Sequence, residues 1–264
     1  MLRVMVRGLR HFLLALQFFT RIPVMGRLAA WVGYSPEMLR ASAAHFPAVG
    51  WLVGAIGAAA FGGALSLWPG MVAAVLCVVV TVLLTGAFHE DGLADVADGL
   101  GGSQRRERAL EIMKDSRIGA FGAIALVLAL GLKVALLSAL AGQGTALACG
   151  AVLAAHVLSR FAPLLLMRTL PYVGGEGGKA KPLADAVSAS ALAIALLWSL
   201  PAVALLIYQY GVVRGVAALL AMAIVTVALG WQFWRRLAGF TGDCLGATQQ
   251  LAELAIYLAL AAHA

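Results

Sequence analysis

The sequence predicts an all-α protein: a polytopic integral membrane helical bundle of about six to seven transmembrane helices, with an N-terminal interfacial amphipathic helix. The first observation is composition, since 62% of the 264 residues are hydrophobic and only 12% are charged. Soluble domains carry about 25% charged residues. The second observation is that apolar runs of about 20 residues recur, each long enough to cross a hydrocarbon core about 30 Å thick. Because lipid offers free backbone groups no partner, these runs indicate helices rather than open sheet.

Residues 1–30 are expected to form the interfacial segment. Their start is basic, as in a signal peptide, but the apolar part contains His11 and Gln17 and no small-residue cleavage site follows. One helical face collects the apolar side chains of Leu9, Phe12, Leu13, Leu16 and Phe19. A single apolar face is typical of a helix that lies at the membrane surface.

The whole chain, residues 1–264, is interpreted as one membrane-embedded domain. The predicted spans are residues 46–67, 71–88, 118–141, 145–167, 189–208, 213–234 and 245–261. The last of these is short and carries Glu253. Three longer polar segments separate some of the spans and are expected to be loops, at residues 89–117, 168–188 and 235–244. The first of the three is the expected catalytic loop.

The placement of positive charge predicts the topology. Of the 19 Lys and Arg residues, all but Lys133, Arg160 and Arg214 fall in the N-terminal part of the chain before the first span or in the three polar loops. Since basic residues stay on the cytoplasmic side, these segments and the active site are expected to face the cytoplasm from the inner membrane. The net charge of +7 therefore reflects topology, and nucleic acid is not an expected partner. Lys133 is expected to extend toward the membrane surface.

An acidic cluster follows the second span. Asp91, Asp95 and Asp98 are spaced i, i+4 and i+7, so on a helix their carboxylates share one face. Two unit charges roughly 6 Å apart repel by about 3 kcal/mol at an effective dielectric near 20. The carboxylates are therefore partly protonated, solvated in a loop, or neutralised by a cation. Oxygen ligands without His or Cys favour Mg²⁺ or Mn²⁺, and such a site suggests a diphosphate substrate. A solvated acidic loop is the alternative.

A second polar motif, "KDSRIGAFG", stands where the chain enters the third span. Lys114, Asp115 and Arg117 are its charged residues. The planar fork of Arg117 suits a phosphate group, and Asp115 could complete a metal site. The alternative is a charge pair that closes the membrane boundary. Farther along, His156 and Arg160 lie one turn apart inside a span, and ionisable groups at such positions are functional candidates because their burial is costly.

Two long motifs carry a resemblance to a known family. "FHEDGLADVADGLGG" at residues 88–102, followed by "ALEIMKDSRIGAFG" at residues 109–122, resembles the signature of the adenosylcobinamide-GDP ribazoletransferase family, also called cobalamin synthase or cobalamin-5'-phosphate synthase. The likeness extends in order over nearly the whole chain. It includes "FFTRIPV" at 18–24, "HFPAVGWLVG" at 45–54, "GGEGGKA" at 174–180 and "FTGDCLGA" at 240–247.

The resemblance implies an inner-membrane transferase of late cobalamin (vitamin B12) biosynthesis. Such enzymes join adenosylcobinamide-GDP to α-ribazole or its 5'-phosphate, release GMP and use Mg²⁺. It implies that Asp91, Asp95 and Asp98 bind the metal, and that Asp115 and Arg117 join them in catalysis. One aspartate, Asp95 or Asp115, would accept the hydroxyl proton.

Further positions in the matching motifs are candidate substrate contacts: Thr20, Arg21, Lys114, Arg160, Lys179 and Asp243. Each has a structural alternative, such as a lipid-headgroup contact for Arg21 or a solvated lysine for Lys179. The competing enzyme classes are a CDP-alcohol phosphotransferase and a prenyltransferase, and a transporter is a third hypothesis. Lipid surrounds the protein under all of them, and homo-oligomerisation is left open.

Overall fold

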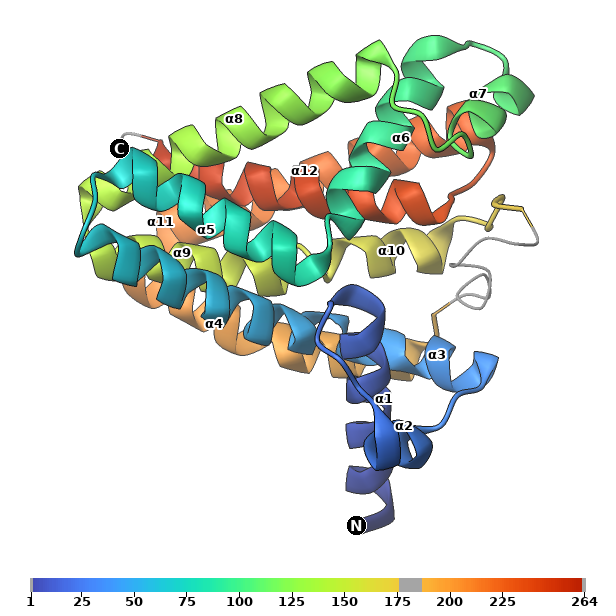
Figure 1. Ribbon diagram of the computed structural model, residues 1–264, viewed down its shortest axis with the longest axis horizontal. Helices are drawn as coiled ribbons and strands as arrows, with labels where there is room; N and C mark the ends of the chain where they lie inside the picture. Colours follow the sequence, from blue (N-terminus) through green and yellow to red (C-terminus); the bar gives the residue numbers. More distant parts are fainter. Residues whose placement is uncertain (1, 176–186, 263–264) are drawn as a thin grey trace.

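The computed structural model describes residues 2–175 and 187–262. Figure 1 shows long helices lying side by side along the longest dimension of the molecule, with shorter helices gathered at one end. Within the described residues the regular structure is entirely helical, apart from a single isolated bridge between Tyr172 and Phe240. The expected all-α class is confirmed.

The helices fall into three groups along the chain, and their bounds are as follows. The N-terminal group is α1 (Leu2–Phe19), α2 (Gly26–Val32), α3 (Pro36–Ser42) and the short 3₁₀ helix η1 (Ala43–His45). The central group is α4 (Phe46–Leu65), α5 (Gly70–Thr85), α6 (Phe88–Gly102), α7 (Arg106–Ile112) and α8 (Ala120–Gln143). The last group is α9 (Thr145–Leu158), α10 (Ala162–Thr169), α11 (Ala189–Leu237) and α12 (Gly242–Ala261).

Length and composition identify the membrane-spanning candidates. Five helical stretches in the described chain are long and apolar enough to cross a membrane, and a sixth is obtained if the bent pair α5 and α6 counts as one span. The final helix α12 qualifies although it carries Glu253. The protein is therefore a multi-pass helical membrane protein, as the apolar runs predict.

The longest helix, α11, consists of two arms. At about 1.5 Å per residue, a straight helix of its 49 residues would be far longer than a hydrocarbon core of about 30 Å. Gly211 breaks it with a φ of 77° and a ψ of 166°, in the left-handed region that glycine tolerates. A Cβ at Gly215 would lie 3.1 Å from the Ile207 side chain across this break. The arms thus fold back on each other, in agreement with the two spans predicted here.

Small residues let α4 and α9 approach closely. A Cβ at Gly50 would lie 2.7 Å from the Val157 Cα atom, and one at Gly54 would lie 2.9 Å from the Leu153 carbonyl oxygen. Only glycine fits at such a contact, which is how small residues drive helix packing in lipid. The stretch "GWLVG" at residues 50–54 is therefore a packing surface.

The helix that carries the acidic cluster is not a straight continuation of the second span. Gly86 caps α5 in the left-handed conformation and Ala87 follows with a φ of 57°. The chain bends by 91° between α5 and α6, so α6 leaves the direction of the bundle (Figure 1). Residues 89–117, predicted as a loop, thus contain the helices α6 and α7.

The N-terminal helix α1 runs across the direction of the long helices (Figure 1). Leu16 and Phe19 on its predicted apolar face are buried against the bundle, Phe12 and Leu13 are partly buried, and Leu9 is half exposed. An amphipathic helix with this orientation is suited to a membrane surface.

Candidate functional site

The polar segments meet at one end of the bundle. The Arg21 N–H donates to the Leu84 carbonyl at 2.8 Å, which ties the N-terminal segment to the end of α5. Arg106 donates from Nε to the Leu237 carbonyl at 2.6 Å, which ties α7 to the end of α11. The bridge between Tyr172 and Phe240 joins the two remaining polar segments. Segments far apart in sequence therefore surround a common space.

A glycine contact brings two acidic motifs together. A Cβ at Gly92 of α6 would lie 2.8 Å from the carbonyl oxygen of Asp243, at the start of α12. Gly246, one turn along α12, packs in the same way against His89, where a Cβ at Gly246 would lie 3.2 Å from the His89 carbonyl oxygen. Because neither glycine has a side chain, the backbones touch, and Asp243 is held beside the acidic face of α6.

A polar cavity of about 250 Å³ opens at this junction. Its charged lining groups are Asp91, Asp243 and Lys114. The other lining residues come from all the converging segments: Phe18, Phe88, Leu110, Met113, Tyr172, Gly174, Gly175, Thr241 and Gly242. This cavity contains Asp91, a predicted metal ligand, and two predicted substrate contacts, Lys114 and Asp243.

The cavity is electrostatically suited to a cation and an anion together. Asp95 is half-buried on α6, and the charges that act on it are those of Asp243, Asp91 and Asp98. Carboxylates gathered in this way repel one another unless a cation lies among them. Lys114 is exposed and lines the same cavity, where its ammonium group could meet a phosphate.

Thr241 and Tyr172 add hydroxyl groups to the cavity. Thr241 caps α12 by accepting a hydrogen bond from the Cys244 N–H, and its own hydroxyl donates to Asp243 Oδ2 at 3.1 Å. This contact orients the Asp243 carboxylate. Partial burial and, secondarily, the charge of Asp243 raise the pKa of Tyr172, so its hydroxyl remains a donor at neutral pH.

Asp98 lies apart from the cavity and serves a helix end. It is buried, and its two carboxylate oxygens accept hydrogen bonds from the Gly119 N–H at 2.7 Å and the Gly122 N–H at 2.8 Å. These are unpaired backbone groups of the first turn of α8, which a carboxylate stabilises. The structure therefore gives Asp98 a capping contact in place of the shared metal position expected from its spacing.

Asp115 and Arg117 pair with each other at the start of α8. Asp115 Oδ2 accepts from Arg117 Nη2 at 2.7 Å, and its Oδ1 accepts from the Arg117 N–H at 3.1 Å. Hydrogen bonds from Arg117 lower the pKa of Asp115 from 3.8 to about 2. Neither residue lines the polar cavity, so the geometry matches the charge-pair alternative for this motif.

The remaining predicted contacts have varied positions. Thr20 is buried at the end of α1, where its hydroxyl donates to the Leu16 carbonyl at 2.8 Å and accepts from the Ile22 N–H. The Arg21 guanidinium packs over Gly86 at the bend between α5 and α6. Lys179 lies outside the described residues.

A narrow apolar crevice of about 30 Å³ adjoins the polar cavity. The two spaces share Phe18, Phe88 and Gly242 as lining residues. Four of the eleven lining residues are phenylalanines, and the polar lining groups are His89, Arg160 and Gln249. Arg160 is 2% exposed, and within the described chain its Nε has no hydrogen-bond partner. Arg160 is therefore buried rather than extended toward the surface.

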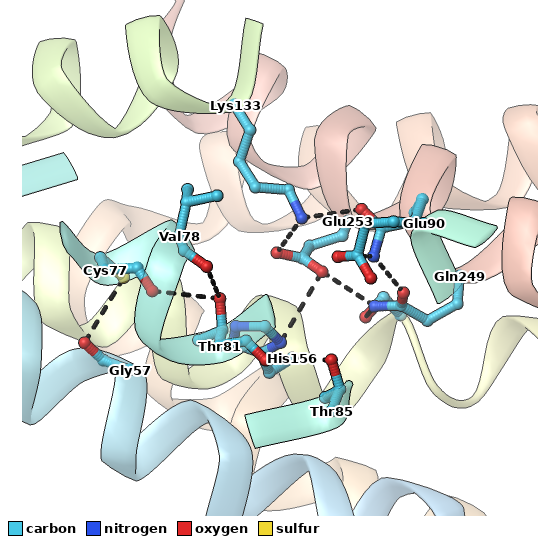
Figure 2. Close-up of polar contacts among 12 residues, drawn as sticks. Gly57, Cys77, Val78, Thr81, Thr85, Glu90, Lys133, His156, Gln249 and Glu253 are labelled. Carbon is cyan, nitrogen blue, oxygen red and sulfur yellow. Dashed lines mark hydrogen bonds and ion pairs between the residues drawn. The ribbon is translucent and has the colours of Figure 1, made fainter. Parts of the chain in front are cut away.

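Behind the crevice, a buried polar network links four helices (Figure 2). Lys133 of α8 contacts Glu253 of α12 at 3.2 Å and donates to Gln250 Oε1 at 2.8 Å. Glu253 also accepts from Gln249 Nε2 at 2.8 Å. Lys133 and Glu253 are 4% and 1% exposed, so the expectation that Lys133 reaches the membrane surface is wrong. An ion partner inside the bundle holds it there.

The network extends to α6 and α9. Gln250 Nε2 donates to Glu90 Oε1 at 3.0 Å, and Glu253 Oε2 lies 3.7 Å from His156 Nδ1. Arg160 Nη1 donates to the His156 carbonyl at 2.8 Å. No role was predicted from the sequence for Glu90, Gln249 or Gln250. The sequence does show that ionisable residues lie inside apolar runs, which marks them as candidates for a role. Which of them pair with each other depends on which helices are neighbours, and the sequence alone does not give this.

The donor set fits a hard cation bound by few protein ligands. Among the described residues, no group of three His, Cys, Asp or Glu side chains is arranged to hold a metal ion by itself. Mg²⁺ usually takes only one or two carboxylates and fills its other positions with water and substrate phosphate. Asp91 and Asp243, which line one cavity, meet this requirement.

Comparison with known proteins agrees with this geometry. The family model described as cobalamin-5-phosphate synthase matches residues 11–261. A protein of Albidiferax ferrireducens named adenosylcobinamide-GDP ribazoletransferase is 56% identical, over 97% of this chain and 99% of its own length. Proteins of the same name from Polaromonas sp. (strain JS666) and Vibrio cholerae are 54% and 44% identical, over 96% of this chain and 96% and 94% of their own lengths. No solved structure matches the chain.

Proposed function

This chain belongs to the cobalamin-5-phosphate synthase family, and we propose that it transfers the cobinamide-phosphate moiety of adenosylcobinamide-GDP to α-ribazole or its 5'-phosphate. The products are GMP and adenosylcobalamin or its 5'-phosphate, and the reaction is a late step of cobalamin biosynthesis. Relatives that cover almost the whole chain carry the name adenosylcobinamide-GDP ribazoletransferase. The chain is therefore assigned as an enzyme of this type.

The observation that carries the proposal is the polar cavity at the end of an otherwise apolar bundle. Asp91, Asp243 and Lys114 all line it. A diphosphate joined to a nucleoside needs a cation for its bridging charge and a basic group for its outer oxygens. The cavity lining offers groups for both needs.

Asp91 and Asp243 are the proposed Mg²⁺ ligands, with Asp95 close behind them. When bound, the ion would offset the charge that develops on the departing phosphate. This assignment replaces the three-aspartate set of the sequence analysis, because Asp98 caps α8. Thr241 orients Asp243 through its hydroxyl.

The chain's own residues then position the reactants. A ribazole hydroxyl oxygen attacks the phosphorus on the cobinamide side, the bond from that phosphorus to the bridging oxygen breaks, and GMP leaves with the bridging oxygen. Asp95 is the proposed acceptor of the hydroxyl proton, because it is half-buried beside Asp91 and Asp243. Asp115 is the weaker candidate, since Arg117 already occupies its carboxylate. Lys114 is proposed to bind a phosphate oxygen of the leaving nucleotide.

The proposed location is the inner membrane, with the cavity at the cytoplasmic face. The described parts of the basic polar segments meet at the end of the bundle that holds the cavity, as the hydrogen bonds of Arg21, Arg106 and Arg236 illustrate. Basic residues favour the cytoplasmic side. A site on that side would be accessible to soluble nucleotide substrates.

Release of GMP tests the function directly. Purified protein in detergent should release GMP from adenosylcobinamide-GDP only when both Mg²⁺ and α-ribazole are added. Equal release without α-ribazole would indicate a hydrolase, and no release under any condition would refute the proposal. Running α-ribazole and its 5'-phosphate side by side identifies the preferred acceptor.

A further inference from the structure

The narrow apolar crevice beside the polar cavity has no role in the function proposed above. Its wall holds four phenylalanine rings in edge-to-face contact: Phe19 lies 4.5 Å from Phe46, and Phe18 lies 5.3 Å from Phe88, between ring centroids. His89 stacks on Phe19 at an interplanar angle of 10°. Such walls take planar aromatic groups, which gain stacking energy beyond the burial of apolar area.

We infer that this crevice binds the base of α-ribazole, a planar, largely apolar benzimidazole with one acceptor nitrogen. The inference deepens the proposed function and rests on it. It assigns the acceptor substrate to the crevice and leaves the diphosphate of the donor to the polar cavity.

Arg160 offers the crevice a buried hydrogen-bond donor. Arg160 is buried and lines the crevice, and its Nε is unpaired within the described chain. A buried donor without a partner is costly, so a ligand that supplies one acceptor gains affinity there. The base of α-ribazole, once joined to ribose through one ring nitrogen, keeps one acceptor on the other.

Charge balance favours a neutral ligand over a phosphate. The charges near Arg160 include those of Glu253 and Glu90, and the second buried cation, Lys133, contacts Glu253. Two cations and two carboxylates sum to zero when all four are ionised. The buried network therefore compensates the Arg160 charge internally, and an anion is not needed to neutralise it.

Competing planar groups fit less well. Guanine presents several donors and acceptors around its edge, and an apolar wall would leave most of them unpaired at a cost. The corrin ring of the donor is far larger than this space. A benzimidazole leaves only one polar atom to satisfy, and the unpaired Arg160 Nε can donate to it.

The position of the crevice also suits the reaction. The base and the attacking hydroxyl belong to one riboside, so their sites must adjoin, and the crevice shares Phe18, Phe88 and Gly242 with the cavity. At about 30 Å³, the crevice has room for only about two water molecules. Entry of a base therefore requires the partly exposed rings of Phe18 and Phe88 to rotate, which would join the two spaces.

Analogues of α-ribazole with an altered base test the inference on the unmodified protein. Replacing the acceptor nitrogen by C–H, as in the indole riboside, should weaken binding about tenfold or more, because it leaves Arg160 Nε unpaired. The benzimidazole ring of α-ribazole carries two methyl groups. Removing both should weaken binding about tenfold through lost apolar contact. Binding is measured by equilibrium dialysis with detergent-solubilised protein. Equal affinity for all three ribosides would overturn the inference.

Variants of the shared rings test the location. Phe18→Leu and Phe88→Leu should each raise KM for α-ribazole about threefold to tenfold, with KM for adenosylcobinamide-GDP changed less than about twofold. Phe121→Leu, at an exposed position of α8, is the matched control and should change neither KM. A KM for α-ribazole that stays at the wild-type value, or equal rises in both, would overturn the crevice assignment.

The two proposals fail in different ways. If wild-type protein releases GMP but the ring variants behave like Phe121→Leu, the function stands and the crevice assignment falls. If wild-type protein has no transferase activity, the function falls, and dialysis of α-ribazole against the same variants decides the crevice assignment. Affinity that drops only in Phe18→Leu and Phe88→Leu supports it. Affinity that is absent in wild type or unchanged in the variants overturns it.

Discussion

Gly92 of α6 lies directly against the backbone of Asp243 at the start of α12, where a Cβ would come within 2.8 Å of the Asp243 carbonyl oxygen. The two residues are 151 positions apart in the sequence (243 minus 92). Their contact joins the two acidic motifs, and the polar cavity forms beside it. The close approach of these helices is therefore a requirement of the proposed metal site.

Substituting this glycine should separate the two motifs. Gly92→Ala forces α6 and α12 apart by a few tenths of an ångström or more, because the obstacle is rigid backbone. Since small displacements of catalytic groups can lower rates about 100-fold, we expect kcat for GMP release to fall by about one to two orders of magnitude. The matched control is Gly63→Ala on α4, where a Cβ meets nothing within 4 Å. Equal activity of the two variants would contradict this account.

Asp98 and Asp91 should respond differently to the same chemical change. Asp98→Asn removes a charge-assisted cap from the first turn of α8 and should lower the free energy of unfolding by about 1–3 kcal/mol. Asp91→Asn, on an exposed side chain, should abolish product formation without lowering the unfolding temperature. Thermal unfolding and GMP release in the same detergent separate the two effects. Loss of activity in Asp98→Asn at unchanged stability would restore Asp98 as a metal ligand.

The buried ion pair predicts a compensating double substitution. Lys133→Met leaves Glu253 buried without its cation, and loss of one partner of such a pair costs about 3–5 kcal/mol. Adding Glu253→Gln removes the uncompensated charge, so the double variant should recover much of the lost stability. Unfolding titrations of wild type, both single variants and the double variant measure the coupling. Simply additive losses would mean that the two side chains do not interact.

The pair at the start of α8 predicts a titration shift. Arg117 hydrogen bonds depress the pKa of Asp115 to about 2 from an ordinary 3.8, so Arg117→Gln should raise the pKa of Asp115 toward its ordinary value. The sign follows from linkage: a depressed carboxyl pKa contributes stability above about pH 4, which is lost as pH falls toward about 2. Carboxyl NMR of labelled aspartate follows the titration. Arg108→Gln is the control, since Arg108 contributes least to the Asp115 shift and should leave it depressed.

Much of the fold follows from the sequence because lipid imposes strong rules. Apolar runs locate the long helices within a few residues, and the break between the arms of α11 falls at Gly211 between two predicted spans. The bend at Gly86 and Ala87 was not predicted. A pair of residues in the left-handed conformation depends on the surrounding packing, which here includes Arg21 over Gly86. The apolar pattern of the sequence does not predict that packing.

The candidate site was predicted in part. Asp91, Lys114 and Asp243 came from separate motifs, and the structure brings them to one cavity. Helical spacing correctly placed Asp98 on the face of α6 but could not show that α8 begins opposite it. The partners of Lys133 and Arg160 could not be predicted from the sequence either, because pairing across helices is set by tertiary packing and not by position along the chain.

Binding of Mn²⁺, a paramagnetic substitute for Mg²⁺, in the presence of GDP tests the central assignment most directly. Electron paramagnetic resonance of the purified protein should show Mn²⁺ bound together with GDP in wild type and in Asp98→Asn. Binding should be lost, by about tenfold or more in affinity, in Asp91→Asn and in Asp243→Asn. Wild-type affinity in both of these variants, or its loss in Asp98→Asn alone, would contradict a metal site built on Asp91 and Asp243.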